Sequence, residues 1–404
     1  MASDVNVAVV GAGQAGLATS YHLTRANVDH VVLEAGRVGE TWRSRRWDSF
    51  CVVTPNWTVS LPGAPYDGSD PDGFIHRDVL VAHLDRWAGS FHAPVKGECA
   101  VSALDQDGDG FVLATSGGKL RARTVVVATG GYQRPHRPAN ADQVPGTVTQ
   151  LLAEEYRNPS RLPDGAVLIV GSGQTGCQLA EELLEAGRKV ILSCGRAPWG
   201  PRRFGGHDLV WWIVETGWWQ RTLRDLPSPA ARLFSNPLAT GHGGGHDLHL
   251  RTLQALGVEL AGRYMGAEDG TVQLTDDLAQ IVAAGDTMSL TFKKAIDGYC
   301  EQAGLRIPWE MPAPFVGRSR TALDLAREGV TTVIWTTGFR PDYGWVHLDV
   351  VDGMGFPVQT DGRSDVPGLY FMGVHFQRKA QSAVLYGVGE DAEVVVQHIA
   401  EDRK

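Results

Sequence analysis

Cysteine is scarce in this sequence, and no pair is spaced for redox or metal chemistry. The five cysteines among 404 residues are scattered, and none belongs to a Cys-x-x-Cys motif. Their scatter argues against a dithiol–disulfide reductase and offers no metal-ligand spacing. Three histidines at 242, 246 and 249 lack a convincing carboxylate or cysteine partner. We therefore expect no metal site and a reducing, cytoplasmic environment.

Long apolar runs and an excess of positive charge are also absent. Nothing approaches the length of a membrane-spanning helix, and no N-terminal signal peptide is recognisable. The net charge of −9 argues against nucleic acid as the main partner. A chain of this length is expected to form two or three compact units, and its 49 glycines suit a fold with many tight strand–helix turns.

The N-terminus carries a dinucleotide-binding fingerprint. Four apolar residues lead into a Gly-Ala-Gly-Gln-Ala-Gly turn, then an amphipathic stretch, a second apolar segment and Glu34. Gly11 permits the tight turn, Gly13 lets the backbone approach a pyrophosphate, and Gly16 lets the helix pack on the strand. The pyrophosphate would lie on the helix N-terminus, and Glu34 would accept hydrogen bonds from an adenosine ribose.

A second fingerprint, Gly-Ser-Gly-Gln-Thr-Gly at 171–176, follows the apolar segment 166–170. At the place corresponding to Glu34 stands Ser193, and Arg196 comes shortly after it. A carboxylate there would repel a 2′-phosphate, whereas a hydroxyl and a guanidinium would accept it. The second site is therefore predicted to bind NADPH, with Arg196 as the phosphate contact; an ordinary surface arginine is the alternative.

Several other segments organise the rest of the chain. Apolar stretches at 125–132 and 332–339 share one shape and end in small residues, which predicts paired crossings between two domains. Helical patterns occupy 79–88 and 276–300, and 258–274 resembles a strand hairpin. The tryptophan-rich segment at about 199–245 would either line a substrate entrance, dock a partner or pack a helix against its domain.

Six segments together resemble the class B flavoprotein monooxygenases, the flavin-containing monooxygenase-like group that includes amine and indole-pyruvate oxygenases and, more distantly, Baeyer–Villiger enzymes. They are GAGQAG with Glu34, GETW at 39–42, VVVATGGY at 125–132, GSGQTG at 171–176, TTGF at 336–339, and YFMGVHF…LYGVGEDA at 370–392. The group's Phe-x-Gly-x-x-x-His signature is not matched. The nearest segment, 144–152, keeps the glycine but has no histidine, so no subgroup is assigned.

The resemblance implies an α/β fold of two Rossmann-like dinucleotide-binding domains, the NADPH domain inserted into the FAD domain. Residues 1–160 and 325–404 would form the FAD domain, and 161–324 the NADPH domain with the tryptophan-rich insert. The implied enzyme is an NADPH-dependent FAD monooxygenase. It would transfer one atom of O2 to a small organic substrate through a C4a-(hydro)peroxyflavin, most naturally at nitrogen or sulfur.

Four alternatives stay open at this point. Baeyer–Villiger oxygenation of a carbonyl, an NADPH oxidase and an electron-transferring reductase all fit the same scaffold. The fourth is a redox sensor that binds both cofactors without turnover. A homo-oligomer is also left open, and the substrate is not readable from the sequence.

The resemblance and the motifs together give a set of candidate site residues. Asn56 and His375 are the candidate catalytic groups, placed near the reacting edge of the flavin. The candidate FAD contacts are Gly11, Gly13, Gln14, Ala15, Gly16, Glu34, Ala35, Gly39, Thr41, Trp42, Trp47, Val101, Ala128, Thr129, Gly130, Thr337, Gly338, Gly373 and Leu385. The candidate NADPH contacts are Gly171, Ser172, Gly173, Gln174, Thr175, Gly176, Ser193 and Arg196.

Overall fold

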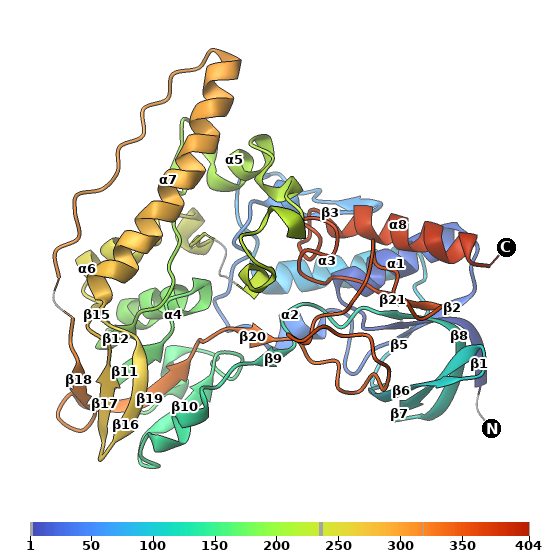
Figure 1. Cartoon of the computed structure of the whole chain (residues 1–404), viewed down its shortest axis with the longest axis horizontal. Coiled ribbons are helices and arrows are strands. Elements are labelled where there is room, and N and C mark those ends of the chain that lie inside the picture. The colour runs from blue at the N-terminus through green and yellow to red at the C-terminus, as the bar shows by residue number, and fades with distance from the viewer. Residues whose placement is uncertain (1–2, 234–236, 318, 404) are drawn as a thin grey trace.

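The computed structural model describes residues 3–233, 237–317 and 319–403. Two lobes lie side by side, each built on a parallel sheet flanked by helices (Figure 1). The first and last parts of the chain form one lobe, which carries both termini, and the middle of the chain forms the other. This is the α/β arrangement that the two fingerprints predict.

The sheet of the first lobe has the strand order β5-β2-β1-β8-β7-β6, with β21 pairing parallel to β8. Its central strands are apolar because both faces are covered. The hairpin β6–β7–β8 continues the sheet antiparallel. The strands are β1 (Ser3–Val10), β2 (His30–Leu33), β5 (Val95–Lys96), β6 (Val101–Asp107), β7 (Gly110–Thr115), β8 (Gly118–Val127) and β21 (Leu369–Phe371), and a separate small hairpin pairs β3 (Ser60–Leu61) with β4 (Ala64–Pro65).

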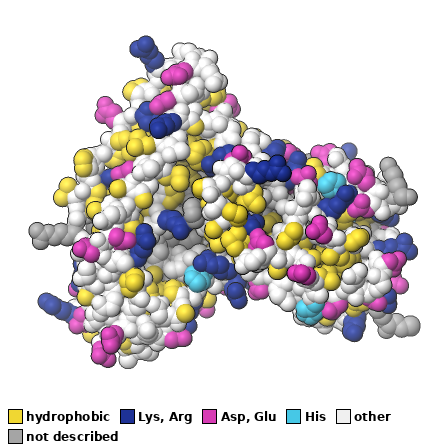
Figure 2. Space-filling model, in the orientation of Figure 1, with side chains coloured by type: hydrophobic (Ala, Val, Ile, Leu, Met, Phe, Trp, Pro, Cys, Tyr) yellow, Lys and Arg dark blue, Asp and Glu magenta, His cyan; other side chains and the backbone are white. Residues whose placement is uncertain are grey.

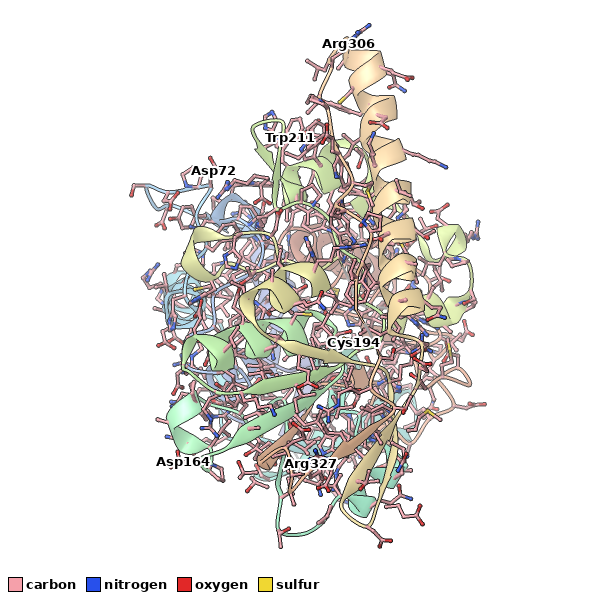
Figure 3. All side chains as sticks on the ribbon, turned by 90° about the vertical axis from the view of Figure 1, so that its left-hand side faces the viewer. Asp72, Asp164, Cys194, Trp211, Arg306 and Arg327 are labelled. Atoms are coloured by element: carbon pink, nitrogen blue, oxygen red, sulfur yellow. The ribbon has the colours of Figure 1, made fainter. Side chains whose placement is uncertain are left out.

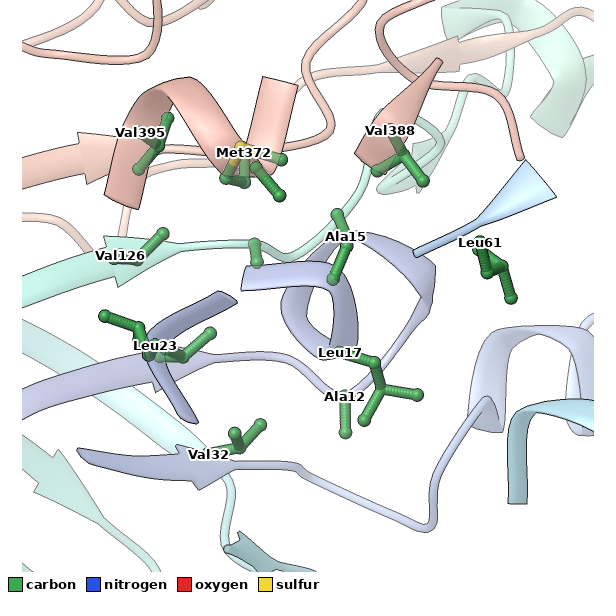
Figure 4. Packing of buried hydrophobic residues seen from close by; sticks show 14 of the residues in the cluster. Ala12, Ala15, Leu17, Leu23, Val32, Leu61, Val126, Met372, Val388 and Val395 are labelled. Atoms are coloured by element: carbon green, nitrogen blue, oxygen red, sulfur yellow. The ribbon is translucent and has the colours of Figure 1, made fainter. Parts of the chain in front are cut away.

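Three helices, α1 (Gln14–Arg25), α3 (Arg77–Ser90) and α8 (Val388–Glu401), contribute to the core on one face of this sheet. Segments from both ends of the chain converge there. Figure 4 shows Ala15 and Leu23 of α1 close to Val126 of β8 and to Met372, which follows β21. The helix predicted at 79–88 is confirmed as α3 and is slightly longer.

The second lobe contains a five-stranded sheet in the order β10-β19-β11-β12-β15, parallel throughout. A three-stranded antiparallel sheet, β16-β17-β18, lies beside it, and the predicted hairpin is its first pair. The elements are β10 (Thr149–Leu152), β11 (Ala166–Val170), α4 (Gln174–Glu185), β12 (Val190–Ser193), α6 (Leu250–Leu256), β15 (Glu259–Ala261), β16 (Tyr264–Glu268), β17 (Thr271–Leu274), α7 (Leu278–Ala303), β18 (Ala322–Asp324) and β19 (Val330–Trp335).

Two strands lie outside the lobe to which the sequence boundaries assign them. Those boundaries, at 160 and 325, place β10 and β19 with the first domain, but both strands hydrogen-bond in the second sheet. Parallel pairing joins segments far apart in the chain, so local pattern does not reveal which sheet a strand enters. We propose that the chain passes between domains just before β10 and just after β19.

The two connections between the lobes lie side by side, as the repeated strand shape predicts. β9 (Arg134–Pro135) pairs antiparallel with β20 (Phe339–Arg340), and the His136 N–H donates to the Gly338 carbonyl at 2.8 Å. Gly130 and Gly338 both have positive φ, and a Cβ added to either would meet no atom within 4 Å. The crossing is therefore a tight double connection with open space beside its glycines.

The tryptophan-rich insert forms a short hairpin, helix α5 and several turns between α7 and the first lobe (Figure 1). Trp212 packs in a core with Phe292 of α7, while Trp219 lies 5.5 Å from the Tyr386 ring of the first lobe. Packing and contact with the other lobe thus both occur. The elements are β13 (Arg203–Phe204), β14 (His207–Asp208), α5 (Leu209–Glu215) and 3₁₀ turns at Trp218–Gln220, Leu223–Asp225, Pro229–Leu233 and His242–Gly244.

The remaining short elements are α2 (Glu40–Ser44) and 3₁₀ turns at Asn56–Thr58, Ala139–Gln143 and Pro159–Arg161. The predicted helix at 276–300 is confirmed as α7, and Figure 3 shows Arg306 at the outer tip that follows it. Within the described ranges, no helix combines the length and apolarity needed to cross a bilayer.

Candidate cofactor and active site

The first glycine turn is shaped by close contacts on its inner side and open space on its outer side. Gly11 has a φ of +109°, and a Cβ there would lie 2.6 Å from the Ala128 carbonyl oxygen. A Cβ on Gly16 would lie 1.8 Å from the Gly11 carbonyl oxygen, whereas one on Gly13 would meet nothing within 4 Å. The turn therefore leaves room for a phosphate group above Gly13 at the start of α1.

Glu34 is fixed at the mouth of this turn. Its carboxylate accepts hydrogen bonds from the Ala12 N–H at 2.7 Å and the Gly36 N–H at 2.9 Å. A carboxylate has about four acceptor positions, so two remain for further donors. This arrangement fits a ribose that offers two hydroxyl groups.

The second turn repeats the geometry of the first. Gly171 also has a φ of +109°, and its Cβ would lie 2.6 Å from the Thr336 carbonyl oxygen. A Cβ on Gly176 would lie 1.9 Å from the Gly171 carbonyl oxygen. Both following helices, α1 and α4, have 12 residues. The chain thus contains two turns of the same design, each opening onto a helix N-terminus.

The two turns differ where Glu34 stands. In the second turn the Ser172 hydroxyl accepts from the Gly195 N–H at 2.8 Å, and no carboxylate takes part. The Ser193 hydroxyl is buried and donates to the Gly262 carbonyl at 2.9 Å. The hydroxyl therefore points into the fold, whereas the sequence suggested that it would face a 2′-phosphate. Arg196 is exposed and follows the last residue of β12 by three positions.

An aromatic wall begins at α2. The Trp42 indole N–H donates to the Gln14 amide oxygen at 2.9 Å, and the Gln14 amide N–H donates to the Ala383 carbonyl at 3.2 Å. Gln14, the first residue of α1, thereby links α2 to the segment before α8. The predicted contact Leu385 is buried in that same segment, two residues after Ala383.

Other predicted contacts are distributed around the first turn and the crossing. Ala15 lies beside Gly373, because a Cβ on that glycine would lie 2.9 Å from the Ala15 Cβ. Thr129 accepts from the Gln133 amide at 2.7 Å, and Thr337 donates to the His136 carbonyl.

The other predicted contacts of this group lie in different environments. Ala35 and Thr41 are exposed. Gly39 precedes α2, and Val101 is the first residue of β6. Trp47 is buried in the core of the second lobe.

Asn56 is buried inside the loop that it begins. Its amide oxygen accepts from the Ile75 N–H at 2.7 Å, and its amide nitrogen donates to the Asp70 carbonyl at 2.8 Å. The carboxamide thus closes the loop between residues 56 and 75. Both of its polar atoms are engaged there, so the structure gives Asn56 a role in holding this loop.

His375 packs against the crossing. A Cβ on Gly131 would lie 2.6 Å from the His375 Nε2, and the imidazole lies edge-on to Tyr132 with ring centroids 4.8 Å apart. Burial, reinforced by the positive charge of Arg232, lowers the pKa of His375 to about 4. The ring is therefore neutral at neutral pH.

Arg232 was not identified from the sequence, because the insert has no periodic pattern. It comes from the turn Pro229–Leu233, forms an ion pair with Asp352 and lies 3.8 Å over the Phe356 ring. An arginine of the insert thus contacts the C-terminal part of the first lobe, and its positive charge lowers the pKa of His375. Only the folded chain brings these segments together.

All five cysteines are free thiols. Cys194 lies at the end of β12, inside the second lobe (Figure 3), and burial raises its pKa to about 12. Burial likewise raises the pKa of Cys177 well above its usual value. Such thiols are poor nucleophiles. His242 pairs with Glu185 at 3.0 Å, and no three candidate metal ligands gather in the described part of the chain.

Comparison with known proteins agrees with this geometry. Residues 8–213 match the family model described as pyridine nucleotide-disulphide oxidoreductase. An uncharacterized CzcO-like oxidoreductase of Geobacillus kaustophilus is 31% identical over 399 residues, which are 98% of both chains. The indole-3-pyruvate monooxygenase YUCCA4 of Oryza sativa is 31% identical over 195 residues, or 43% of this chain and 44% of that protein.

Solved structures share the whole fold. A flavin-containing monooxygenase from Stenotrophomonas maltophilia has a TM-score of 0.68 at 20% identity, and the bacillithiol disulfide reductase Bdr from Staphylococcus aureus has 0.65 at 13%, each covering all of both chains. The S-allyl-L-cysteine S-oxygenase of Allium sativum has 0.56 at 15%, covering 99% of this chain and 80% of that one. The predicted fold class is confirmed. The chain therefore belongs to the pyridine nucleotide-disulphide oxidoreductase family, as a class B flavin monooxygenase-like enzyme that uses FAD and NADPH.

Proposed function

We propose that this enzyme transfers one oxygen atom from O2 to a nitrogen or sulfur atom of a small organic substrate, at the expense of NADPH. The observation that carries the proposal is that the two glycine turns share one backbone shape but differ in the side chain beside them. The first has a fixed carboxylate, Glu34, and the second has none. This difference suits FAD in the first turn and a coenzyme with a 2′-phosphate in the second.

In the proposed FAD site, Glu34 binds the adenosine ribose and the N–H groups at the start of α1 bind the diphosphate. The hydrogen-bonded chain of Trp42, Gln14 and Ala383 fixes the side wall. Bound there, FAD supplies the electron transfer from coenzyme to oxygen. Asn56 acts as a positioning residue, because it holds the neighbouring loop through two backbone contacts.

Oxygenation at nitrogen or sulfur is favoured by the groups at the crossing. Attack by a soft nucleophile requires a protonated oxidant, whereas attack on a carbonyl requires a deprotonated one. His375, which packs against Gly131 of the crossing, has a pKa of about 4 and is therefore a weak base. It does not remove a proton efficiently at neutral pH. This favours nitrogen or sulfur over Baeyer–Villiger chemistry.

A screen of amines, thioethers and ketones tests the proposal. For each compound, the NADPH consumed and the hydrogen peroxide released are measured with FAD-loaded protein. We expect at least one amine or thioether for which NADPH consumption clearly exceeds peroxide release. Stoichiometric peroxide with every compound would indicate an oxidase, and coupling with ketones alone would indicate a Baeyer–Villiger enzyme.

The coenzyme assignment has a separate test at Arg196. We expect Arg196→Ala to raise the KM for NADPH by roughly tenfold or more and to leave that for NADH unchanged, since about 1.5–3 kcal/mol of charged hydrogen bonding to the 2′-phosphate is lost. Arg203→Ala is the matched control, because Arg203 is an exposed arginine that donates to the Gly244 carbonyl. An equal effect on both coenzymes would refute the assignment.

A further inference from the structure

We propose that Arg46 binds a phosphate group of the NADP coenzyme and thereby holds the coenzyme across the two glycine turns. This inference rests on the proposed function, in which the coenzyme occupies the second turn. Arg46 lies just after α2, in the first lobe, and belongs to neither fingerprint.

The position of Arg46 lies between the two fingerprint helices. Its guanidinium carbon is 5.3 Å from the centroid of the Trp42 ring and 5.7 Å from that of Phe50. Trp42 donates to Gln14, the first residue of α1. Phe50 belongs to the core of the second lobe with Cys177 of α4. The guanidinium is thus connected on one side to the first turn and on the other side to the second.

The neighbouring arginines are all satisfied within the protein. Arg43 pairs with Asp85, Arg45 with Glu154 at 3.4 Å, and Arg77 with Asp48 at 3.1 Å. Arg157 donates to the backbone carbonyls of residues 44, 154 and 156. Each of these four arginines thus has a carboxylate partner or several carbonyl acceptors within the protein.

Arg46 differs from these neighbours. Among the residues that the structure describes, no carboxylate lies within ion-pair distance of it, and its side chain makes one hydrogen bond, from Nη1 to its neighbour's carbonyl at 3.1 Å. Burial lowers the pKa of Arg46, yet an arginine remains charged at neutral pH. The carboxylate that acts on Arg46 from a distance is that of Glu154, which is already paired with Arg45 at 3.4 Å. A half-buried cation without a direct ion pair is unfavourable in the free protein and favours the binding of an anion.

A coenzyme phosphate fits this cation better than other anions. The proposed diphosphate site at the start of α4 and the proposed flavin site at the start of α1 flank Arg46, so the coenzyme must pass between them. A guanidinium donates to phosphate oxygens in a bidentate fork, and its stacking on Trp42 and Phe50 would hold its plane. On the face drawn in Figure 2, Lys and Arg side chains lie at the junction of the lobes as well as elsewhere on the surface.

Binding of NADP⁺ to the FAD-loaded protein tests this inference directly. The dissociation constant is measured by calorimetry for wild type, Arg46→Met and Arg46→Lys, at two salt concentrations. We expect the Met variant to bind NADP⁺ roughly 10- to 100-fold more weakly, with a smaller salt dependence, and the Lys variant to lie between it and wild type. Arg43→Met, which removes an arginine paired at the surface, is the matched control and is expected to bind as wild type does.

FAD content and melting temperature show whether each variant is folded. If Arg46→Met does not fold, the comparison is made with Arg46→Lys instead. Unchanged NADP⁺ binding in a folded Arg46 variant would overturn the inference. So would unchanged NADP⁺ binding together with a raised KM for a coupled substrate, which would assign the cation to a substrate anion. Failure of wild type to bind NADP⁺ at all would instead overturn the proposed function.

Discussion

Single residues decide which cofactor each turn accepts. Glu34 serves two purposes, because its carboxylate stabilises the first turn through two backbone N–H groups and keeps acceptor positions for a ligand. Ser172 supplies the corresponding contact in the second turn with a neutral hydroxyl. One difference in side-chain charge thus separates two sites whose backbones are nearly the same.

Glu34→Ala tests this view. We expect FAD affinity to fall roughly 10- to 100-fold, since hydrogen bonds to a charged acceptor contribute about 1.5–3 kcal/mol, and the melting temperature of the apoprotein to fall as well. FAD titration of apoprotein, followed by fluorescence quenching, measures the first effect. Glu301→Ala, at an exposed position near the end of α7, is the control. Unchanged FAD affinity in Glu34→Ala would contradict the assignment of the first turn.

His375 links a single proton to stability. Its pKa is about 4 in the folded chain and about 6.5 in the unfolded chain, so the unfolded state binds more protons between these values. The contribution of His375 to the free energy of unfolding is therefore fully present above pH 6.5 and is lost as the pH falls toward 4, by about 3 kcal/mol. We expect His375→Asn to lack this part of the decrease in urea unfolding of FAD-loaded protein between pH 4 and 6.5. If the free energy of unfolding fell equally with pH in wild type and His375→Asn, His375 would not be the group responsible for the decrease.

At the scale of elements, each fingerprint depends on a helix packed closely on its strand. Ala in place of Gly16 or Gly176 would bring its Cβ within 2 Å of a carbonyl oxygen of the same turn, at 1.8 and 1.9 Å. We expect each substitution to displace the helix, destabilise the protein by about 2–4 kcal/mol and abolish binding of the cofactor at that turn alone. Urea unfolding and separate FAD and NADP⁺ titrations measure these effects.

The matched control for both glycines is Gly298→Ala in α7, where an added Cβ meets nothing within 4 Å. Because alanine favours a helix over glycine, we expect this variant to be more stable by about 0.5–1 kcal/mol. If Gly16→Ala and Gly176→Ala behaved like this control, the close-packing account of the two turns would be wrong.

Much of this was predictable from sequence because the informative patterns are local. A glycine turn, its flanking strand and the helix after it occupy about 30 consecutive residues, and α3 and α7 show clear helical periodicity. Sheet membership is not local. β10 and β19 pair with each other although nearly two hundred residues separate them. The inward direction of the Ser193 hydroxyl depends likewise on the neighbouring strand, through the Gly262 carbonyl.

At the scale of the whole molecule, the tryptophan-rich insert joins the second lobe to the first. Arg202 pairs with Asp208 at 2.9 Å, both almost fully buried, and donates to the Val53 carbonyl of the first lobe at 2.8 Å. The Ala380 N–H of the first lobe donates to the Arg221 carbonyl at 2.8 Å. The insert had no readable pattern, because its contacts are made with distant segments. These contacts join the insert to the first lobe across the junction.

The account as a whole concerns where the oxygen atom goes. Its most direct test is turnover of the best amine or thioether from the screen under isotopically heavy O2, with mass spectrometry of the product. We predict one heavy oxygen atom in the product for each NADPH consumed beyond the peroxide released. A product without heavy oxygen, or NADPH consumption matched entirely by peroxide, would contradict the assignment of this chain as a monooxygenase of nitrogen or sulfur.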